Sequence, residues 1–381
     1  MSEKRVISIR NANSYDFGGG ERVPVFIARE VAKYSDLKPI IFSGSKKLLD
    51  FARTESVPYL KTWWWSKQAW SGIQVLLVPI YVLWQVVLYF YYLVLFIKYN
   101  PLLVHLQSKD DFIAGTFAAR TLNIRVLWSD YADLKHIFLN HKIWYKNPIG
   151  KMVYFAGHFA EQIIVVSEED KSLISVHIPK GDIKDKLRVI YNGAFDTYKK
   201  PEKKSIFTFV STGRLVTDKG IGELIKAFNL LNRAHPDTAL QILSDGPERS
   251  YFEELAKSNK SISFTGYQID PLELMVKDHV FVLPTYHEGF SIALVEACML
   301  EMPIIATRVG GNVEIIQDHQ TGLLVPIKDV DALCKAMDKL YSNKKLCDKL
   351  AENAREQYVK RFQFDQIVKK EFIPLYMGSK K

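Results

Sequence analysis

The feature that most constrains the fold is an alternation of short apolar runs with longer segments of helical period. In the first part of the chain the apolar runs lie at 6–9, 39–42, 102–106, 124–128, 163–166 and 188–190. The helical segments between them lie at 22–33, 112–122, 149–160 and 168–175. Such an alternation predicts βα units, which build a parallel sheet with helices on both faces.

The same alternation starts again after a polar linker at 198–204. Further strands are predicted at 207–211, 239–243, 261–264, 280–283, 304–306 and 323–325, with helices at 222–233 and 291–300. The prediction is an α/β fold with two Rossmann-like, doubly wound domains, an N-terminal one over 1–197 and a C-terminal one over 203–360. Ligands bind at the carboxyl ends of parallel strands, so two facing domains would place the site in a central cleft.

The last segment, 361–381, is predicted to be a helix with an apolar stripe that includes Phe364, Val368 and Phe372. An apolar stripe has to be buried against a partner. We expect the segment either to pack back onto the N-terminal domain or to complete the C-terminal one.

Composition narrows the class of protein. The 381 residues contain three cysteines without metal-ligand spacing, which excludes a disulfide framework and a zinc site and favours a reducing cytosol. The N-terminus lacks the apolar core of a signal peptide.

The first 200 residues hold 27 of the 51 Lys and Arg but only 18 of the 42 Asp and Glu, so the net charge of +9 lies entirely in this half. The basic residues form no dense run with interleaved aromatics, so no nucleic acid is expected as a partner.

Residues 68–97 contain no charged side chain. The segment is long enough to cross a membrane, but the strands before and after it are predicted to share one sheet, which a single crossing would separate. We therefore expect one part to be a crossover helix and another an apolar surface in the bilayer interface, with Pro79 between them. Trp63, Trp64, Trp65 and Trp70 suit the headgroup level, and the positive charge of this half suits anionic lipid. The alternative is a fully buried crossover helix.

Glycines follow the first predicted strand, at Gly18, Gly19 and Gly20. A glycine turn before a helix lets backbone amides approach a phosphate. The spacing is not that of a dinucleotide fingerprint, and a purely structural turn is the alternative.

Two cations flank a predicted strand-to-helix turn in the C-terminal half. Arg214 follows the strand at 207–211, and Lys219 precedes the helix at 222–233. A guanidinium and an ammonium at this position suit a diphosphate. The alternative is a solvated surface pair.

Two glutamates accompany the next predicted turn. Glu288 lies between the strand ending at Leu283 and a helix beginning near Ser291, and Glu296 lies in that helix among apolar residues. The helix N-terminus offers free amides to an anion. Carboxylates beside an anion site are costly unless they bind something else, such as sugar or ribose hydroxyls, and a structural salt bridge is the alternative.

Together these residues resemble the retaining glycosyltransferases of family four, which have the GT-B fold of two Rossmann-like domains. The family's Glu-x7-Glu motif corresponds to Glu288 and Glu296, and its Gly-Arg-Leu…Lys-Gly signature to 213–215 and 219–220. Its Gly-Asp-Gly-Pro turn corresponds to 244–247, with Ser in place of the first Gly. Further matching segments follow in order at 264–267, 303–306, 310–311 and 321–325.

The resemblance implies a role for each matching residue at the donor. Arg214 and Lys219 would hold the diphosphate and stabilise charge on the leaving group. Glu296 would bind the ribose, and Glu288 would face the donor sugar. The remaining donor-binding positions would be Gly19, Gly20, Gly213, Asp245, Gly246, Tyr267, Gly289, Phe290 and Ser291.

The resemblance implies no metal and no cofactor besides the nucleotide-sugar. Asp329 and Asp331 form a superficial DxD pattern, but they open a helix, so we expect Asp329 to be an N-cap.

The sequence departs from the family at one N-terminal catalytic position. Many relatives have a His after the strand that corresponds to 124–128, whereas this chain has Asp130 close behind it. Asp130 either takes over the polar role near the sugar or is a loop residue. His105 is a weaker candidate, for which we expect a structural role, and no general base is assigned.

The resulting expectation is a retaining, hexosyltransferase-type glycosyltransferase, peripheral or monotopic on the cytoplasmic side of a membrane. Its partners would be a nucleotide-sugar donor, a lipid-linked or membrane-proximal glycan acceptor and an anionic membrane surface. The alternatives are a soluble nucleotide-sugar-processing enzyme of the same fold and a non-catalytic subunit of a glycan-assembly complex.

Overall fold

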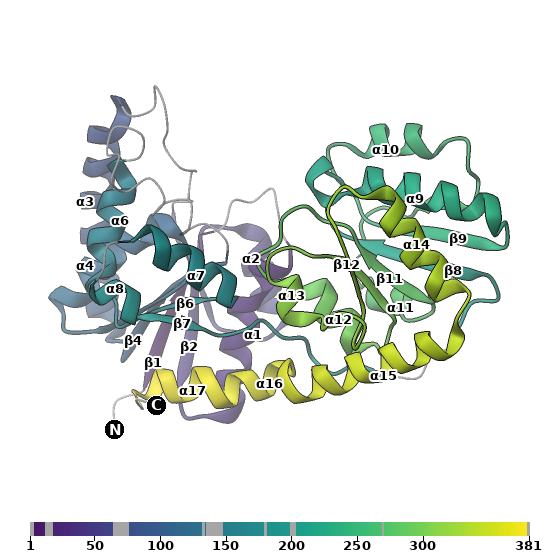
Figure 1. The fold of residues 1–381 in the computed structure, drawn as a ribbon. Helices are drawn as coiled ribbons and strands as arrows, with labels where there is room; N and C mark the ends of the chain where they lie inside the picture. Colours follow the sequence, from purple (N-terminus) through teal and green to yellow (C-terminus); the bar gives the residue numbers. More distant parts are fainter. Residues whose placement is uncertain are drawn as a thin grey trace. The chain divides into compact units, whose positions relative to one another are not determined.

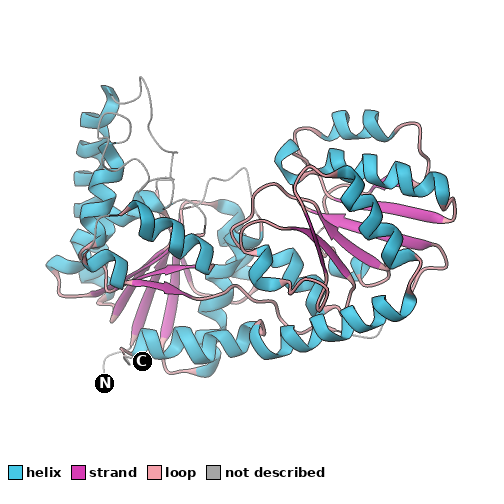
Figure 2. Ribbon diagram, viewed as in Figure 1, coloured by secondary structure: helices cyan, strands magenta, loops and turns pink. Residues whose placement is uncertain are grey.

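The computed structural model describes residues 4–11, 18–63, 76–131, 134, 148–178, 181–198, 203–268 and 270–378. It divides into two compact units. The first unit is Met1–Tyr191 together with Asp365–Lys381, and the second unit is Asn192–Phe364. Each unit contains a parallel sheet with helices packed on it (Figures 1 and 2), which confirms the predicted α/β fold with two parallel-sheet domains.

The described part of the first unit has a seven-stranded sheet in the order β3-β2-β1-β4-β5-β6-β7. The strands are β1 Arg5–Ile9, β2 Lys38–Ser43, β3 Tyr59–Lys61, β4 Leu103–Leu106, β5 Arg125–Ser129, β6 Gln162–Val165 and β7 Leu187–Val189. Ile9 lies opposite Phe42 on one side and Leu106 on the other. The strand order therefore reverses between β1 and β4. The sequence gives no sign of β3, because this edge strand is short and largely exposed.

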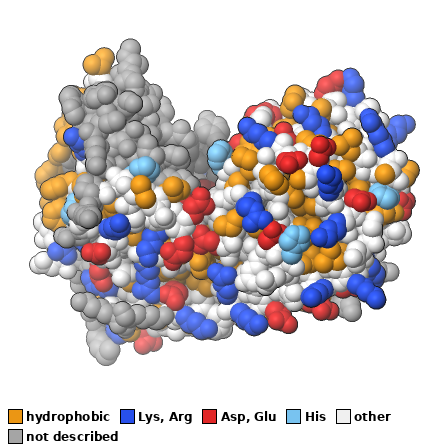
Figure 3. All heavy atoms as spheres, viewed as in Figure 1, with side chains coloured by type: hydrophobic (Ala, Val, Ile, Leu, Met, Phe, Trp, Pro, Cys, Tyr) orange, Lys and Arg blue, Asp and Glu red, His pale blue; other side chains and the backbone are white. Residues whose placement is uncertain are grey.

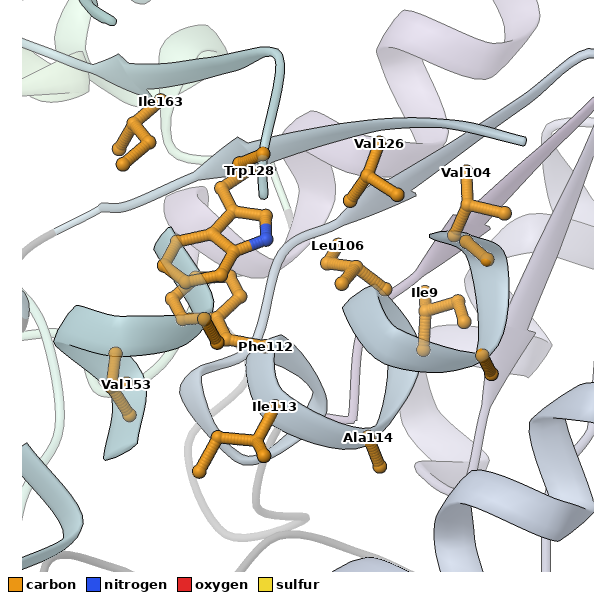
Figure 4. Packing of buried hydrophobic residues seen from close by; sticks show 14 of the residues in the cluster. Ile9, Val104, Leu106, Phe112, Ile113, Ala114, Val126, Trp128, Val153 and Ile163 are labelled. Atoms are coloured by element: carbon orange, nitrogen blue, oxygen red, sulfur yellow. The ribbon is translucent and has the colours of Figure 1, made fainter. Parts of the chain in front are cut away.

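The helices of the first unit are α1 Gly19–Tyr34, α2 Lys46–Thr54, α3 Val78–Tyr99, α4 Phe112–Thr121, α6 Pro148–Gly157, α7 Glu168–His177 and α8 Asp182–Asp185. α3 packs on α4, and α4 packs on α6. Under α4, the ring of Phe112 stacks on Trp128 of β5 with 4.2 Å between centroids (Figure 4), and the Trp128 indole donates to Thr116 Oγ1 at 2.9 Å. The largest core residue is thus both packed and hydrogen-bonded.

The C-terminal segment completes the first unit. It consists of α16 Phe364–Ile367, a π-helical turn at Val368–Phe372 and α17 Ile373–Met377. Arg125 donates to the carbonyl oxygens of Leu375 (2.8 Å) and Tyr376 (2.7 Å), and Arg188 pairs with Glu371. These contacts tie the segment to strands β5 and β7.

Helix α3 is continuous over 22 residues and apolar on both faces. Pro79 lies in its first turn, where a missing N–H costs nothing. The helix thus begins beside Pro79, and the expectation that Pro79 separates two parts of the uncharged segment stays a prediction, because most of the part before it lies outside the described residues. The buried face consists of Tyr81, Gln85, Leu88, Tyr92 and Phe96. Only 28% of its most apolar 18-residue window is buried, so the helix is not fully buried, and by length and composition it could cross a membrane. Residues 64–75, with Trp64, Trp65 and Trp70, lie outside the described residues.

The second unit has a six-stranded sheet in the order β10-β9-β8-β11-β12-β13 over its described residues. The strands are β8 Phe207–Thr212, β9 Thr238–Leu243, β10 Ile262–Phe264, β11 Val280–Leu283, β12 Ile304–Thr307 and β13 Leu323–Val325. The helices are α9 Ile221–Ala234, α10 Arg249–Ala256, α11 Leu272–Met275, α12 Ile292–Met299, α13 Asn312–Ile315, α14 Val330–Tyr341 and α15 Lys344–Arg361. Phe209 lies opposite Leu240 and Val280, so here the strand order reverses between β8 and β11.

Candidate functional site

The candidate site lies at the carboxyl edge of the second sheet. Four of the loops that leave the sheet at this edge are 213–220 after β8, 244–248 after β9, 284–291 after β11 and 308–311 after β12. β8 and β11 are neighbours but continue in opposite directions across the sheet. Ligands of doubly wound proteins bind at such a reversal, because the two connections diverge there and leave a crevice.

Backbone contacts join the loops after β8 and β11. Gly220 has a left-handed φ of 68° and ends the 3-10 turn Thr217–Lys219. A Cβ at Gly220 would lie 2.0 Å from the carbonyl oxygen of Pro284, so only glycine fits. The amide of Tyr286 donates to the Asp218 carbonyl at 2.8 Å. The loop that carries Lys219 is therefore fixed against the loop that carries Glu288.

A glycine pair supports the turn at Glu288 from the β12 side. Gly310 has a φ of 51°, and a Cβ there would lie 1.6 Å from the Glu288 carbonyl oxygen. Gly311 donates its amide to the Gly289 carbonyl at 3.0 Å. The position of Glu288 thus depends on a close backbone approach that no other residue type permits.

The helix after this turn begins as predicted. Ser291 is the N-cap of α12, and its hydroxyl oxygen accepts from the Leu294 amide at 3.3 Å. Phe290 is buried, and Glu296 lies half-buried five residues past the cap.

The central polar contact of the edge is an ion pair. Lys219 Nζ lies 3.0 Å from Glu288 Oε2, with the two side chains 24% and 20% exposed. Beside the pair, the Tyr286 hydroxyl donates to Glu223, and burial together with this carboxylate raises the pKa of Tyr286. Arg214 lies exposed near the start of the same loop as Lys219. The cations Arg214 and Lys219 and the carboxylates Glu223 and Glu288 therefore all lie where the strand order reverses between β8 and β11.

The turn after β9 is joined to the loop after β8 by backbone hydrogen bonds. Leu215 donates its amide to the Asp245 carbonyl at 2.9 Å and accepts from the Glu248 amide at 3.1 Å. A Cβ at Gly246 would lie 2.6 Å from backbone atoms of Leu215. The Asp245 carboxylate accepts from the Gly246 amide at 2.8 Å and pairs with Arg249 at 3.3 Å. Gly246 therefore permits the close approach, and the Asp245 side chain is engaged within its own turn.

Tyr267 and Gly213 complete the predicted positions in the second unit. Gly213 opens the loop after β8. Tyr267 follows edge strand β10, which is two strands from β8, and its side chain is exposed.

The other predicted residues belong to the first unit. Gly19 and Gly20 form the first turn of α1, and the Gly18 amide donates to Glu21 Oε2 at 2.9 Å. Asp130 directly follows β5, is almost fully buried and accepts from the Leu134 amide at 3.0 Å. The structure thus brings Arg214, Lys219, Glu288 and Glu296 into one unit and leaves Asp130 in the other.

His105 has the expected structural role. It is fully buried, with Nδ1 2.7 Å from the Tyr376 hydroxyl and Nε2 2.7 Å from the Ser129 hydroxyl. Burial lowers the pKa of His105 to about 3, so the ring is neutral at physiological pH.

The reversal in the first sheet holds a polar cluster that the sequence reasoning missed. Arg10, directly after β1, lies 5.2 Å over the ring of Tyr131 and pairs with Glu21 at 3.2 Å. The Tyr131 hydroxyl donates to Gln107 Oε1 at 2.7 Å. These residues share no motif. The one sign in the sequence that they could form a site is that Arg10 and Gln107 each directly follow a predicted strand.

A buried acid lies next to this cluster. Asp111 accepts from the Tyr92 hydroxyl at 2.6 Å and from Asn11 Nδ2 at 3.2 Å. Burial raises its pKa to about 7. Tyr92 belongs to α3, so this helix is hydrogen-bonded to the loop after β4.

Among the described residues, no three His, Cys, Asp or Glu side chains lie close enough together to hold a metal ion. Asp329 is the N-cap of α14 and accepts from the Ala332 amide at 2.8 Å, as predicted.

Comparisons with known proteins agree with this geometry. Residues 194–357 match the family model described as "Glycosyl transferases group 1". The capsular polysaccharide biosynthesis glycosyltransferase CapM of Staphylococcus aureus is 28% identical over 174 residues, which cover 45% of this chain and 46% of that protein. The lipopolysaccharide core biosynthesis glycosyltransferase LpsE of Rhizobium meliloti is 30% identical over 161 residues, 42% of this chain and 46% of that protein. The chain thus spans about half the length of these relatives.

Solved structures are similar over nearly the whole chain. A glycosyltransferase of Rickettsia africae ESF-5 has a TM-score of 0.75 at 20% identity, covering 100% of both chains. Anabaena HepE, in complex with UDP and glucose, has a TM-score of 0.75 at 17% identity, covering 98% of this chain and 100% of that one.

The solved structures identify the fold. The fold is the GT-B fold of glycosyltransferases, as predicted. Residues 194–357, which form most of the second unit, are the part of the chain that matches the glycosyl transferases group 1.

Proposed function

We propose that this chain is a retaining glycosyltransferase that moves a hexosyl group from a nucleotide-sugar to a lipid-linked or membrane-proximal glycan. The observation that carries the proposal is the Lys219–Glu288 ion pair at the strand-order reversal, inside the region that matches the glycosyl transferases group 1. The relatives CapM and LpsE are named for capsular polysaccharide and lipopolysaccharide core biosynthesis, which supports a glycan acceptor.

The ion pair suits a site that exchanges partners when substrate binds. In the free protein Lys219 and Glu288 neutralise each other at 3.0 Å. A diphosphate would draw Lys219 and the nearby Arg214 toward its oxygens and release Glu288 to accept hydrogen bonds from sugar hydroxyls. Because negative charge grows on the diphosphate as the glycosidic bond breaks, the two cations would stabilise the transition state more than the ground state.

The donor would lie along the edge, with Glu296 on α12 holding the ribose and the backbone of Gly289–Ser291 facing the phosphates. HepE was crystallised with UDP, so a UDP-sugar is the first donor to test. We infer retention from the family resemblance, which assigns no general base to a protein side chain. The leaving group is stabilised by Arg214 and Lys219, so we propose that no metal is required.

The same proposal places the protein on the cytoplasmic side of a membrane. The long apolar helix α3 supports contact with a membrane, since many of its apolar side chains are exposed. This exposure also disfavours the alternative of a soluble nucleotide-sugar-processing enzyme. The presence of Arg214, Lys219, Glu288 and Glu296 disfavours a non-catalytic subunit.

The test combines donor binding with turnover. The purified chain is screened against a panel of nucleotide-sugars by thermal shift, and nucleotide release is then measured with membrane extracts as a source of acceptor, with and without EDTA. We expect stabilisation by one donor class and acceptor-dependent release that EDTA does not reduce. Release that is independent of acceptor would support a hydrolase instead.

Variants locate the activity. Lys219→Ala is expected to lower turnover by about 100-fold or more, the size of effect seen when one group that stabilises developing charge is removed. Lys226→Ala is the matched control, because Lys226 is exposed on α9 close in sequence but carries no proposed role. Equal turnover in the two variants would contradict the site assignment.

A further inference from the structure

Helix α3 presents an exposed apolar stripe that runs along its whole length. Ile80, Leu83, Val87, Phe90, Val94 and Ile97 recur every three or four residues, which places them on one face. All are exposed, Leu83, Phe90 and Val94 by 66%, 58% and 65%. A soluble helix normally turns charged or polar residues to this side. Patches of hydrophobic side chains are visible along the upper left margin of Figure 3, on the side where Figure 1 labels α3.

Exposed apolar side chains also lie on and just after α6. Phe155 of α6 and Phe159 just after it are both exposed. Their rings contact Phe117 of α4, at 6.1 and 5.5 Å between centroids. Since α4 also packs on α3, one connected layer of three helices carries these side chains. We call the stripe on α3 together with Phe155 and Phe159 the docking face.

The charges on this layer are all of one sign. α3, α4 and α6 contain three charged residues, Lys98, Arg120 and Lys151, each of which is exposed. None of the three helices contains an acidic residue. Exposed hydrophobic side chains on helices whose charged residues are all cations are complementary to an anionic lipid surface. Glu161, just after Phe159, is paired with Arg125.

The same features disfavour a helix-to-helix partner. A three- and four-residue repeat also suits a coiled-coil seam, but such seams are flanked by charged residues that select the partner. Here the exposed flanking positions Leu77, Val82 and Val86 are apolar. A face this wide and uncharged is better covered by lipid than by one opposing helix.

The opposite side of α3 packs against the rest of the first unit. Leu88, Tyr92 and Phe96 are fully buried. The Gln85 amide donates to the Asp110 carbonyl at 3.2 Å and its oxygen accepts from the Ala114 amide at 3.1 Å. Lipid therefore cannot surround the helix, although its length would allow a crossing.

We propose that the docking face inserts into one leaflet of an anionic bilayer, with α3 lying along the interface rather than across the membrane. Gln85 bonds the other side of the helix to Asp110 and Ala114, and Tyr92 bonds it to Asp111, in the segment that follows the carboxyl end of β4. Insertion thereby holds the polar edge with Arg10, Gln107 and Tyr131 at a fixed depth beside the lipid headgroups. The inference rests on the proposed function only in that the membrane would supply the acceptor.

The main test is vesicle flotation of the full chain. Phosphatidylcholine vesicles with and without phosphatidylglycerol are compared at low and high salt. We expect binding that phosphatidylglycerol strengthens and salt weakens. The triple variant Leu83→Glu/Phe90→Glu/Val94→Glu should bind about 100-fold more weakly. The matched control is Val176→Glu/Ile206→Glu/Val359→Glu, which adds the same charge at exposed apolar positions outside the three helices and should bind like wild type. The proposal would be overturned if Leu83→Glu/Phe90→Glu/Val94→Glu bound the vesicles as tightly as the wild type.

Two further measurements separate the alternatives. Single Glu substitutions at Ile80, Phe90 and Ile97 should weaken binding to a similar extent if the helix lies flat, whereas a spanning helix would be most sensitive at its centre. Light scattering without lipid should show no dimer. A wild-type dimer that the triple variant cannot form would mean that the docking face binds a second copy of the chain. Thermal stabilisation by UDP should be unchanged in the triple variant, so loss of vesicle binding and loss of donor binding are distinguishable.

Discussion

The two sheets end in edges that are built by different means. At the edge of the second sheet, backbone meets backbone. Gly220 lies against Pro284 and Gly310 against Glu288, and the charged side chains above them are half-buried or exposed. At the edge of the first sheet, side chains from distant segments bond to one another, as in the contact of Asn11 and Tyr92 with Asp111.

This difference separates two ways of making a binding edge. Backbone crossings leave the ionic side chains above them able to change partners, which suits the binding and release of a charged donor. A network of buried side chains fixes the position of each member, which suits a rigid support. Substitutions that target each kind of contact can test the contrast.

The largest effect is expected where a side chain is forced between two backbones. Gly310→Ala would put a Cβ 1.6 Å from the Glu288 carbonyl oxygen at a φ of 51°. The turn has to shift, at a cost of about 3–5 kcal/mol in the stability of the second unit. Donor binding should weaken strongly at the same time. Denaturant unfolding and thermal shift with the donor measure the two losses.

The control for this substitution is Gly222→Ala, on α9. A Cβ there would meet Leu255 and Phe252 at 3.8 and 3.9 Å, which are ordinary contacts. Replacing a helical glycine by alanine should stabilise the unit by about 0.5–1 kcal/mol and leave donor binding unchanged. Similar results for the two variants would show that the backbone crossing does not hold the edge.

The side-chain network of the first unit should respond to pH. Burial raises the pKa of Asp111 from 3.8 to about 7, so folding favours its protonated form. Its contribution to stability is complete below about pH 4 and is lost as the pH rises through about 7. Asp111→Asn removes this titration. The variant should therefore gain on wild type between about pH 5 and pH 8, by on the order of 2–3 kcal/mol.

Unfolding by denaturant at the two pH values measures this gain. Asp50→Asn, at an exposed position on α2, serves as the control and should follow wild type at both pH values. A difference between Asp111→Asn and wild type that does not change with pH would mean that Asp111 is already ionised in the folded protein.

A smaller effect is expected where the same unit binds its C-terminal segment. Arg125→Met removes the hydrogen bonds to the Leu375 and Tyr376 carbonyls and the pair with Glu161. The loss should be about 2 kcal/mol, with faster amide exchange over 373–378. Arg53→Met is the control, since Arg53 contacts Asp50 and Tyr59 at the surface. Unchanged exchange in Arg125→Met would show that packing alone retains the segment.

The contrast between the edges also explains what the sequence could reveal. In the second unit the glycines and charged residues of the site lie in short loops next to strong apolar strands, so Arg214, Lys219, Glu288 and the cap Ser291 could be placed from local pattern alone. In the first unit the contacts of Arg10 with Tyr131 and of Tyr92 with Asp111 join segments far apart in sequence, and no local pattern encodes them. The short edge strand β3 was missed for a different reason, because its three residues are largely exposed and carry no apolar pattern.

The return of residues 365–381 to the first unit has a consequence for synthesis on the ribosome. The second unit is one uninterrupted stretch, Asn192–Phe364, and can fold as soon as it has emerged. The first unit, although translated earlier, lacks the partners of His105, Arg125 and Arg188 until Glu371 and Tyr376 are made. The half that begins the chain is therefore the last to be completed.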